Sequence, residues 1–151
     1  MIEERYFSPN KLYDKIVNLN KSVDVSVIGK SVLKKPIYQL KLGSGPKKIL
    51  FWSQMHGNES TTTRALFDFI NWLLLKTNKK YLKNLSFYII PQLNPDGAEL
   101  YTRKNFNNID LNRDAINLSQ PESRCIVNLY NEINPHFCFN LHGQKTIYSV
   151  G

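Results

Sequence analysis

The residues at positions 54–59 combine a metal-binding histidine with a carboxylate at close spacing. An apolar run, residues 49–52, leads directly into a turn that carries His56 and Glu59. Since the two residues are three apart, both side chains can converge on one point where a strand ends and a helix begins. Zinc takes imidazole nitrogen and carboxylate oxygen as ligands at about 2.0–2.2 Å. Without a metal, His56 would be an ordinary turn residue, and Glu59 would favour the N-terminus of a helix.

Further polar residues of the same kind follow two later apolar runs. Residues 91–97 come after the run 85–90, and residues 142–144, which begin with His142, come after the run 137–141. If these runs are parallel strands, their carboxyl ends lie side by side at one edge of a sheet. The sequence therefore predicts that residues 54–59, 91–97 and 142–144 meet there.

The pattern of apolar residues predicts the elements that carry these turns. Ser8 and Pro9 have the chemistry of a helix start. Leu66, Phe69, Ile70 and Leu73 recur at helical spacing and predict a helix from Glu59 to Leu75. Strands are expected at residues 23–27, 37–42, 49–52, 85–90 and 137–141, and a further helix at 121–132. Alternation of strands and helices after residue 49 predicts an α/β fold with a mixed, mostly parallel sheet flanked by helices.

The composition limits the class of protein. A chain of 151 residues with 42% apolar residues can build one domain with its own core. No apolar run approaches the ~20 residues of a membrane helix, so no membrane partner is expected. The N-terminus lacks the apolar region of a signal peptide, which favours a cytoplasmic protein if Met1 is the natural start. Cys125 and Cys138 lie in apolar contexts and are expected to be small core residues.

The net charge of +8 raises the question of nucleic-acid binding. The excess comes mainly from lysines spread over the first half of the chain. No aromatic and basic motif typical of nucleic-acid recognition accompanies them. We therefore interpret these lysines as solvated surface, and we expect no nucleic-acid partner.

With these motifs in hand, the sequence resembles the zinc carboxypeptidase family, the metallocarboxypeptidases of the carboxypeptidase A and E type. The matching segments are His56-Gly57-Asn58-Glu59 for H-x-x-E, Asn94-Pro95-Asp96-Gly97 for N-P-D-G, Arg103, Asp110-Leu111-Asn112-Arg113 for D-x-N-R, and His142 after an apolar strand. They occur in the order of the family, from residue 49 to the end of the chain. A lone H-x-x-E would be weak, whereas five matches in order favour the metal interpretation.

The resemblance implies a zinc site with His56, Glu59 and His142 as ligands. Two histidines and one glutamate are the ligand set known for carboxypeptidase A. Three protein ligands leave a position for water, whose pKa a bound zinc can lower from ~15.7 toward ~7. By the same resemblance, Asp110 accepts the other ring N–H of His56 and fixes its tautomer.

The resemblance also implies how a substrate is held. Arg113, with Asn112, would bind the terminal carboxylate of a peptide or protein, which suits a planar guanidinium. Arg103 would face the carbonyl oxygen as charge develops on it, a catalytic role. The implied reaction is hydrolysis of the C-terminal peptide bond. Alternatively, Arg113 could form an ion pair with a neighbouring aspartate, and Arg103 could be solvated. The N-P-D-G segment is expected to be scaffold.

The sequence departs from the family in one respect. The family uses a glutamate base and a substrate-facing tyrosine well downstream of the third ligand, and no carboxylate here, including Glu99, Glu122 and Glu132, stands in a matching context. Residues 1–151 therefore resemble the amino-terminal part of a single catalytic domain. We expect that part to be inactive alone and prone to self-association.

Two other functions remain open at this point. The first is a zinc-dependent deacylase of N-acyl amino acids, of the succinylglutamate desuccinylase and aspartoacylase type, which shares the H-G-N-E turn and an Asn-Arg pair. The intact N-P-D-G segment favours a carboxypeptidase over such an enzyme. The second is a non-catalytic domain that holds zinc but lacks the base.

Overall fold

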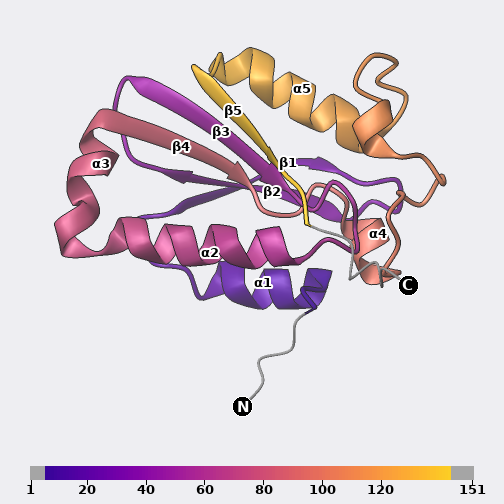
Figure 1. Ribbon diagram of the computed structural model, residues 1–151, viewed down its shortest axis with the longest axis horizontal. Coiled ribbons are helices and arrows are strands. Elements are labelled where there is room, and N and C mark those ends of the chain that lie inside the picture. Colours follow the sequence, from indigo (N-terminus) through magenta and orange to yellow (C-terminus); the bar gives the residue numbers. More distant parts are fainter. Residues whose placement is uncertain (1–5, 144–151) are drawn as a thin grey trace, which may run out of the picture.

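In the computed structural model, which describes residues 6–143, five strands form one open mixed sheet with helices on both faces (Figure 1). The elements in chain order are α1 Pro9–Val17, β1 Asp24–Lys30, β2 Pro36–Leu42, β3 Lys47–Ser53, α2 Thr61–Leu74, the 3₁₀ turn η1 Lys76–Asn78, α3 Lys79–Asn84, β4 Leu85–Ile90, α4 Pro95–Glu99, the 3₁₀ turn η2 Leu111–Arg113, α5 Pro121–Ile133 and β5 Phe137–Leu141. The predicted α/β class with a mixed sheet is confirmed.

The order of strands across the sheet is β1-β2-β4-β3-β5. The pairs β1–β2 and β2–β4 are antiparallel, whereas β3 pairs in parallel with both β4 and β5. Leu50 at the centre of β3 aligns with Tyr88 on one side and Cys138 on the other. The carboxyl ends of β4, β3 and β5 therefore lie at the same edge of the sheet, as the sequence predicted.

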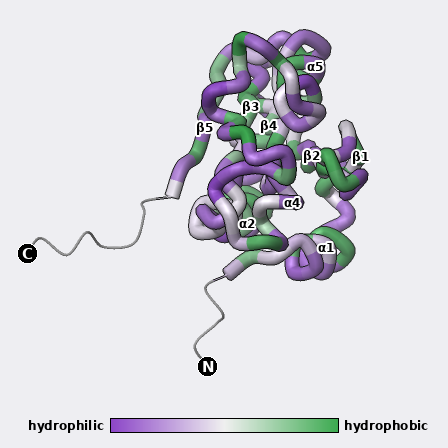
Figure 2. Tube along the Cα trace, turned by 90° about the vertical axis from the view of Figure 1, so that its right-hand side faces the viewer, coloured by the Kyte–Doolittle hydropathy of each residue, from purple (hydrophilic) through white to green (hydrophobic). Residues whose placement is uncertain are grey.

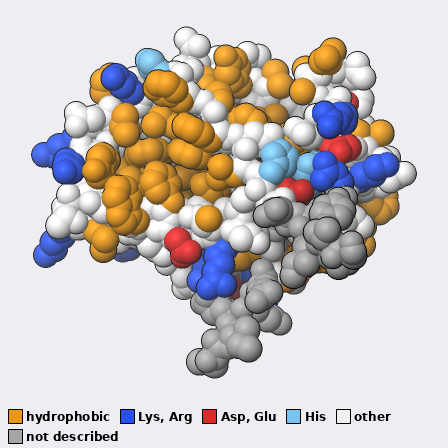
Figure 3. Space-filling model, viewed as in Figure 1, with side chains coloured by type: hydrophobic (Ala, Val, Ile, Leu, Met, Phe, Trp, Pro, Cys, Tyr) orange, Lys and Arg blue, Asp and Glu red, His pale blue; other side chains and the backbone are white. Residues whose placement is uncertain are grey.

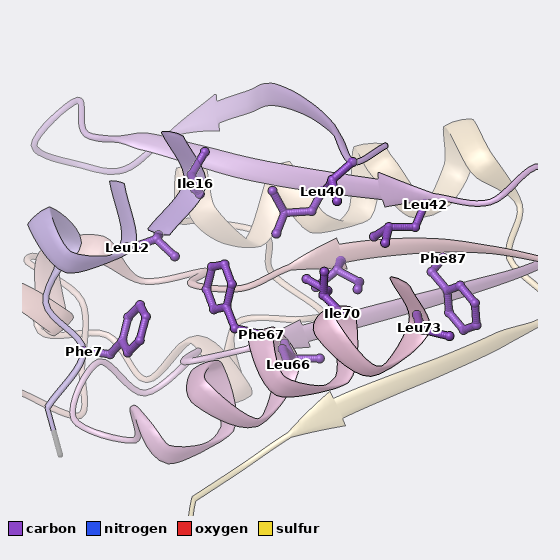
Figure 4. Packing of buried hydrophobic residues seen from close by; sticks show 12 residues of the cluster. Phe7, Leu12, Ile16, Leu40, Leu42, Leu66, Phe67, Ile70, Leu73 and Phe87 are labelled. Carbon is purple, nitrogen blue, oxygen red and sulfur yellow. The ribbon is translucent and has the colours of Figure 1, made fainter. Parts of the chain in front are cut away.

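Helices α1 and α2 cover one face of the sheet. Leu12 and Ile16 of α1 and Leu66, Ile70 and Leu73 of α2 are buried against strand residues of β2 and β4 (Figure 4). Ser8 caps α1, since its hydroxyl accepts a hydrogen bond from the backbone N of Lys11 at 3.4 Å. The N-terminal helix is thus held by both its cap and its apolar face.

Helix α5 covers the opposite face. Its buried residues Cys125, Leu129 and Ile133 pack in a cluster with Leu50 and Ile90 of the central strands. Figure 2 shows hydrophobic residues, in green, along the central strands. Because β3 is covered on both faces, it forms a rigid base for the turn that follows it. No helix within residues 6–143 has the length and apolar character needed to cross a membrane.

The structure differs from the sequence prediction at two helices. Helix α2 begins at Thr61 rather than Glu59, because Glu59 belongs to the turn that precedes it. The Asn94-Pro95-Asp96-Gly97 segment, predicted as a turn, opens the short helix α4, in which the Asn94 side chain accepts a hydrogen bond from the Gly97 N at 2.8 Å. Pro in the first turn of a helix loses no internal hydrogen bond, so the helix tolerates it.

The prediction that Cys138 is a core residue was wrong, although Cys125 is buried. Cys138 lies on β5, which is an edge strand of the described sheet and is exposed along most of its length. Phe137 and Phe139 of the same strand are 59% and 45% exposed. Figure 3 shows a broad hydrophobic surface, in orange, on the same side of the molecule as β5.

Candidate metal centre

The turn after β3 is shaped by an unusual backbone conformation. Gln54 follows the last strand residue, is fully buried and has φ of 48°, in the left-handed region. For residues other than glycine this region costs about 1–2 kcal/mol. The turn then closes with a hydrogen bond from the Glu59 N to the His56 carbonyl at 3.0 Å. His56 and Glu59 are thereby brought to the same side.

The turn rests on the segment after β4. The backbone N of Asn94 donates to the Gln54 carbonyl at 3.1 Å, and its side-chain amide donates to the Met55 carbonyl at 3.2 Å. A Cβ atom on Gly57 would lie 2.0 Å from the carbonyl carbon of Gly97, so only glycine fits at position 57. The N-P-D-G segment is therefore scaffold beneath the turn that carries His56 and Glu59.

The three predicted ligands converge. The Nδ1 atom of His56 lies 2.8 Å from Oε1 of Glu59, and the Nδ1 atom of His142 lies 3.1 Å from Oε2 of Glu59. The two Nδ1 atoms are 3.2 Å apart, and the three donor atoms all lie within 4.8 Å of one another. His56 and Glu59 are buried, whereas His142 is partly open to solvent. Figure 3 shows histidine beside acidic and basic side chains on this face.

These donors fit a tetrahedral cation. Two ligands at about 2.0–2.1 Å from a tetrahedral zinc lie roughly 3.3 Å apart. The Nδ1 atom of His142 is at nearly this separation from Nδ1 of His56, 3.2 Å, and from Oε2 of Glu59, 3.1 Å. The Nε2 atom of His56 lies 3.0 Å from Oδ1 of Asp110, so a neutral His56 carries its proton there and turns a lone pair toward Glu59. Lone pairs that face one another repel, and a cation between them removes that repulsion. The donor set therefore suits zinc.

Asp110 and Arg103 complete the acidic and basic surroundings. Arg103 donates from Nε to Oδ2 of Asp110 at 3.1 Å and from Nη1 to Oε1 of Glu59 at 3.3 Å. Partial burial raises the pKa of Asp110, but hydrogen bonds from His56, the backbone N of Asn112 and Arg103 outweigh it and leave the pKa below its usual value. Asp110 is thus ionised at neutral pH and faces the ring of His56.

Glu59 is held by one further group that the sequence did not reveal. The backbone N of Gly143 donates to Oε2 of Glu59 at 2.9 Å. A Cβ atom at position 143 would meet the Glu59 Cβ at 3.2 Å, so glycine eases this approach. Gly143, the residue after His142, therefore orients the Glu59 carboxylate. In the sequence, the only sign of this contact is that a glycine follows His142.

Asn112 and Arg113 lie on η2, directly after Asp110. The Asn112 N donates to Oδ1 of Asp110 at 3.0 Å, and its side-chain oxygen accepts from Asn140 at 3.4 Å. Arg113 is joined to Asp110 through its backbone N, at 2.9 Å from the Asp110 carbonyl. Its side chain is exposed and forms no ion pair with either neighbouring aspartate within residues 6–143. Asn140, which lies on β5, was not predicted.

Comparison with known proteins places this chain in a family. A profile of the family described as zinc carboxypeptidase matches residues 10–116, which is more than half of the chain. The chain belongs to the zinc carboxypeptidase family. The resemblance inferred from the motifs is thus confirmed, and the fold agrees with it.

Relatives of this zinc carboxypeptidase family member include enzymes from plants and bacteria. Carboxypeptidase SOL1 of Arabidopsis thaliana is 31% identical over 137 residues, a match that covers 77% of this chain and 28% of the plant protein. Gamma-D-glutamyl-L-diamino acid endopeptidase 1 of Lysinibacillus sphaericus is 36% identical over 83 residues, covering 48% of this chain and 21% of that protein.

A solved structure agrees in fold. The metallo-carboxypeptidase from Burkholderia cenocepacia superposes with a TM-score of 0.83 at 20% sequence identity, covering 94% of this chain and 42% of that one. The present chain therefore spans less than half the length of that enzyme, and about a quarter of the length of the relatives that it matches in sequence.

Proposed function

We propose that residues 1–151 form the amino-terminal, metal-binding part of a zinc carboxypeptidase domain, which hydrolyses the C-terminal peptide bond of peptides or proteins. The observation that carries this proposal is the convergence of His56, Glu59 and His142 within 4.8 Å. Each comes from the carboxyl end of a parallel strand or the turn after it. When bound, zinc supplies a Lewis acid that can activate water for attack on a peptide carbonyl.

The residues around the three ligands have separate tasks in this proposal. Asp110 keeps the proton of His56 on Nε2, so that Nδ1 is free to bind metal. Arg103 lies within hydrogen-bond distance of both Glu59 and Asp110, at the border of the site. From there its guanidinium can turn toward the substrate carbonyl oxygen and stabilise the charge that develops on it.

Arg113 is the proposed anchor for the free carboxylate of the substrate. It is exposed and has no ion-pair partner among the described residues, so its planar fork is open to a carboxylate. Asn112 beside it can add an amide donor. Because the backbone N atoms of both residues bind Asp110, the anchor stands at a fixed distance from the metal centre.

No glutamate of the described chain is placed to act as a general base at this centre. Glu122 is fully buried and accepts hydrogen bonds from the Val32 N and Asn105, while Glu99 pairs with Lys35. Glu132 lies on α5, on the face opposite α2. We therefore infer that the catalytic base belongs to a part of the family domain beyond these residues, and that this chain alone does not turn over peptides.

The substrate class has one alternative with specific support. The relative from Lysinibacillus sphaericus is named as a gamma-D-glutamyl-L-diamino acid endopeptidase, and it is the more identical of the two sequence relatives. A γ-D-glutamyl–diamino acid bond is thus a second candidate substrate. A deacylase of N-acyl amino acids is disfavoured by the N-P-D-G scaffold and the family match, and a purely zinc-holding domain would bind metal without binding peptide.

The proposal can be tested by peptide binding. We expect the zinc-loaded chain to bind an N-acetylated dipeptide with a free C-terminus, and to bind the C-terminal amide of the same peptide at least about tenfold more weakly, because charged hydrogen bonds are lost. Titration calorimetry with and without zinc measures both. Equal affinity for acid and amide would contradict the proposal. Turnover at enzyme rates of roughly 1–10³ s⁻¹ would contradict the inference that the base lies outside these residues.

A further inference from the structure

Gln54 is a buried polar residue that stands at the start of the metal-binding turn. It is fully buried, and its backbone has φ of 48°. Glycine would adopt this conformation without steric cost, and an apolar side chain would be buried without loss of hydration. A glutamine at this position therefore needs compensating interactions from its side chain.

The carboxamide of Gln54 makes four hydrogen bonds. Its Nε2 donates to the Gly57 carbonyl at 2.7 Å and to the Phe7 carbonyl at 3.2 Å. Its Oε1 accepts from the Thr63 hydroxyl at 2.7 Å and from Nε2 of Gln92 at 3.0 Å. Both N–H groups and both lone pairs of the amide are thus used. Its orientation is fixed, because two carbonyl oxygens can only face the NH₂ group.

These four contacts join separate segments of the chain. Thr63 lies in the first turn of α2, Gln92 follows β4, and Phe7 precedes α1 and stacks on Phe67 of α2. All of them belong to the packed body of the fold. Gly57, by contrast, is the residue directly after His56. The amide therefore ties the turn between His56 and Glu59 to three separate segments of the packed chain.

We propose that Gln54 is a positioning residue for the metal centre, which holds the turn so that the His56 ring points at Glu59 and His142. The hydrogen bond to the Gly57 carbonyl fixes the peptide plane between Gly57 and Asn58, within the turn that joins His56 to Glu59. The packing of Gly57 on Gly97 holds the same turn from its other side. The inference rests on the proposed zinc site, since the orientation of the His56 ring matters to the protein only if the ring binds a metal.

Two variants and one control separate positioning from general stability. Gln54→Gly keeps the left-handed backbone and removes the amide. Gln54→Asn also tolerates that backbone, but its side chain is one methylene shorter, so its amide cannot reach both Gly57 and Thr63. Gln92→Ala is the control, because Gln92 is equally buried and also donates to the Phe7 carbonyl, but it contacts the Gln54 amide oxygen and not the Gly57 carbonyl beyond His56.

We expect Gln54→Gly and Gln54→Asn to bind zinc at least tenfold more weakly than the unaltered chain in competition with a chromophoric chelator. Gln92→Ala should change zinc affinity by less than threefold, even if it lowers the thermal midpoint of the metal-free chain as much as the Gln54 variants do. The visible absorption of bound Co²⁺ should shift in the Gln54 variants and not in Gln92→Ala, since only the former disturb ligand geometry.

Each outcome decides between the two claims. If the unaltered chain binds no zinc, the proposed function fails, and the inference with it. If the unaltered chain binds zinc and a folded Gln54 variant binds it within twofold, with an unchanged Co²⁺ spectrum, Gln54 has no positioning role. Should Gln54→Gly not fold, Gln54→Asn gives the same decision.

Discussion

The Nε2 atom of His56 lies 3.0 Å from Oδ1 of Asp110, on the side of the ring opposite Glu59 and His142. This one contact leaves a single ring nitrogen to face the other two ligand candidates. It also links the turn after β3 to the loop between α4 and η2, fifty-four residues later in the chain. The orientation of the His56 ring toward the other two ligand candidates thus depends on a residue that is not itself one of them.

The first prediction concerns this contact. Asp110→Ala should weaken zinc binding about 10–100-fold, because the His56 ring loses its fixed tautomer and orientation. Asp110→Asn, which keeps an oxygen for the Asn112 N, should have a smaller effect. Chelator competition measures both affinities. Unchanged affinity in Asp110→Ala would show that His56 needs no partner on Nε2.

The second prediction concerns Arg113. Arg113→Ala should weaken binding of a free-acid dipeptide to the zinc-loaded chain by about tenfold or more, while zinc affinity stays the same, since Arg113 touches the centre only through its backbone. Arg113→Lys keeps the charge but loses the fork, and should recover only part of the affinity. Equal losses on free-acid and amidated peptides would mean that Arg113 supports the fold rather than the substrate.

The third prediction concerns stability toward acid. Asp114 accepts hydrogen bonds from the Ser119 hydroxyl at 2.6 Å, the Ser119 N at 3.0 Å and the Gln120 N at 2.9 Å. Burial raises the pKa of Asp114, but these bonds and the Ser123 hydroxyl outweigh it and lower the pKa below its model-peptide value. An acid with a lowered folded-state pKa stabilises the fold above its unfolded pKa, and the contribution disappears as pH falls through the folded-state pKa.

Asp114→Asn should therefore lower the free energy of unfolding at pH 7 by about 1–3 kcal/mol, the usual loss for a buried hydrogen-bond acceptor. The difference in unfolding free energy between Asp114→Asn and the unaltered chain should shrink as the pH falls below about 4. In that range the Asp114 carboxylate is protonated in the unfolded chain before it is protonated in the folded one. Urea unfolding at several pH values measures it. Asp14→Asn, on the surface of α1, is the matched control and should change little at any pH.

The fourth prediction concerns the edge of the sheet. Strand β5 contains no charged residue or proline, the features that normally protect an edge strand from pairing with another chain. We expect the chain to self-associate with rising concentration, and Phe137→Lys to suppress this. Sedimentation velocity at several protein concentrations measures the association. Tyr13→Lys, on a comparably exposed aromatic residue of α1, should leave the association unchanged; suppression by both variants would point to net charge instead.

The sequence predicted the convergence of the ligands for a general physical reason. Apolar runs that end in polar turns mark the carboxyl ends of buried strands, and parallel strands bring those ends together. Helix α4 could not be predicted in the same way, since Pro95 and Gly97 are more typical of turns than of helices. The exposure of Cys138 could not be predicted from the sequence either, because the burial of a strand residue depends on which strands and helices pack against that strand.

One contact and one backbone conformation near the site could not be predicted from any local sequence pattern. The Asn140 side chain donates a hydrogen bond to the Asn112 side chain, twenty-eight residues earlier in the chain, and nothing in the sequence around either residue predicts this pairing. The left-handed backbone of Gln54 was equally unpredictable, because glutamine rarely adopts it, and only the surrounding carbonyl groups explain why it does here.

Zinc stoichiometry tests the central claim most directly. The chain has three histidines, of which His56 and His142 belong to the cluster. His136 directly precedes β5 and accepts a hydrogen bond from the Lys48 N at 3.1 Å. After dialysis against dilute zinc, we predict about one bound zinc per chain by atomic emission for the unaltered protein and for His136→Ala. His142→Ala should retain almost none, since one of three ligands is gone. Full zinc retention by a folded His142→Ala would contradict the account.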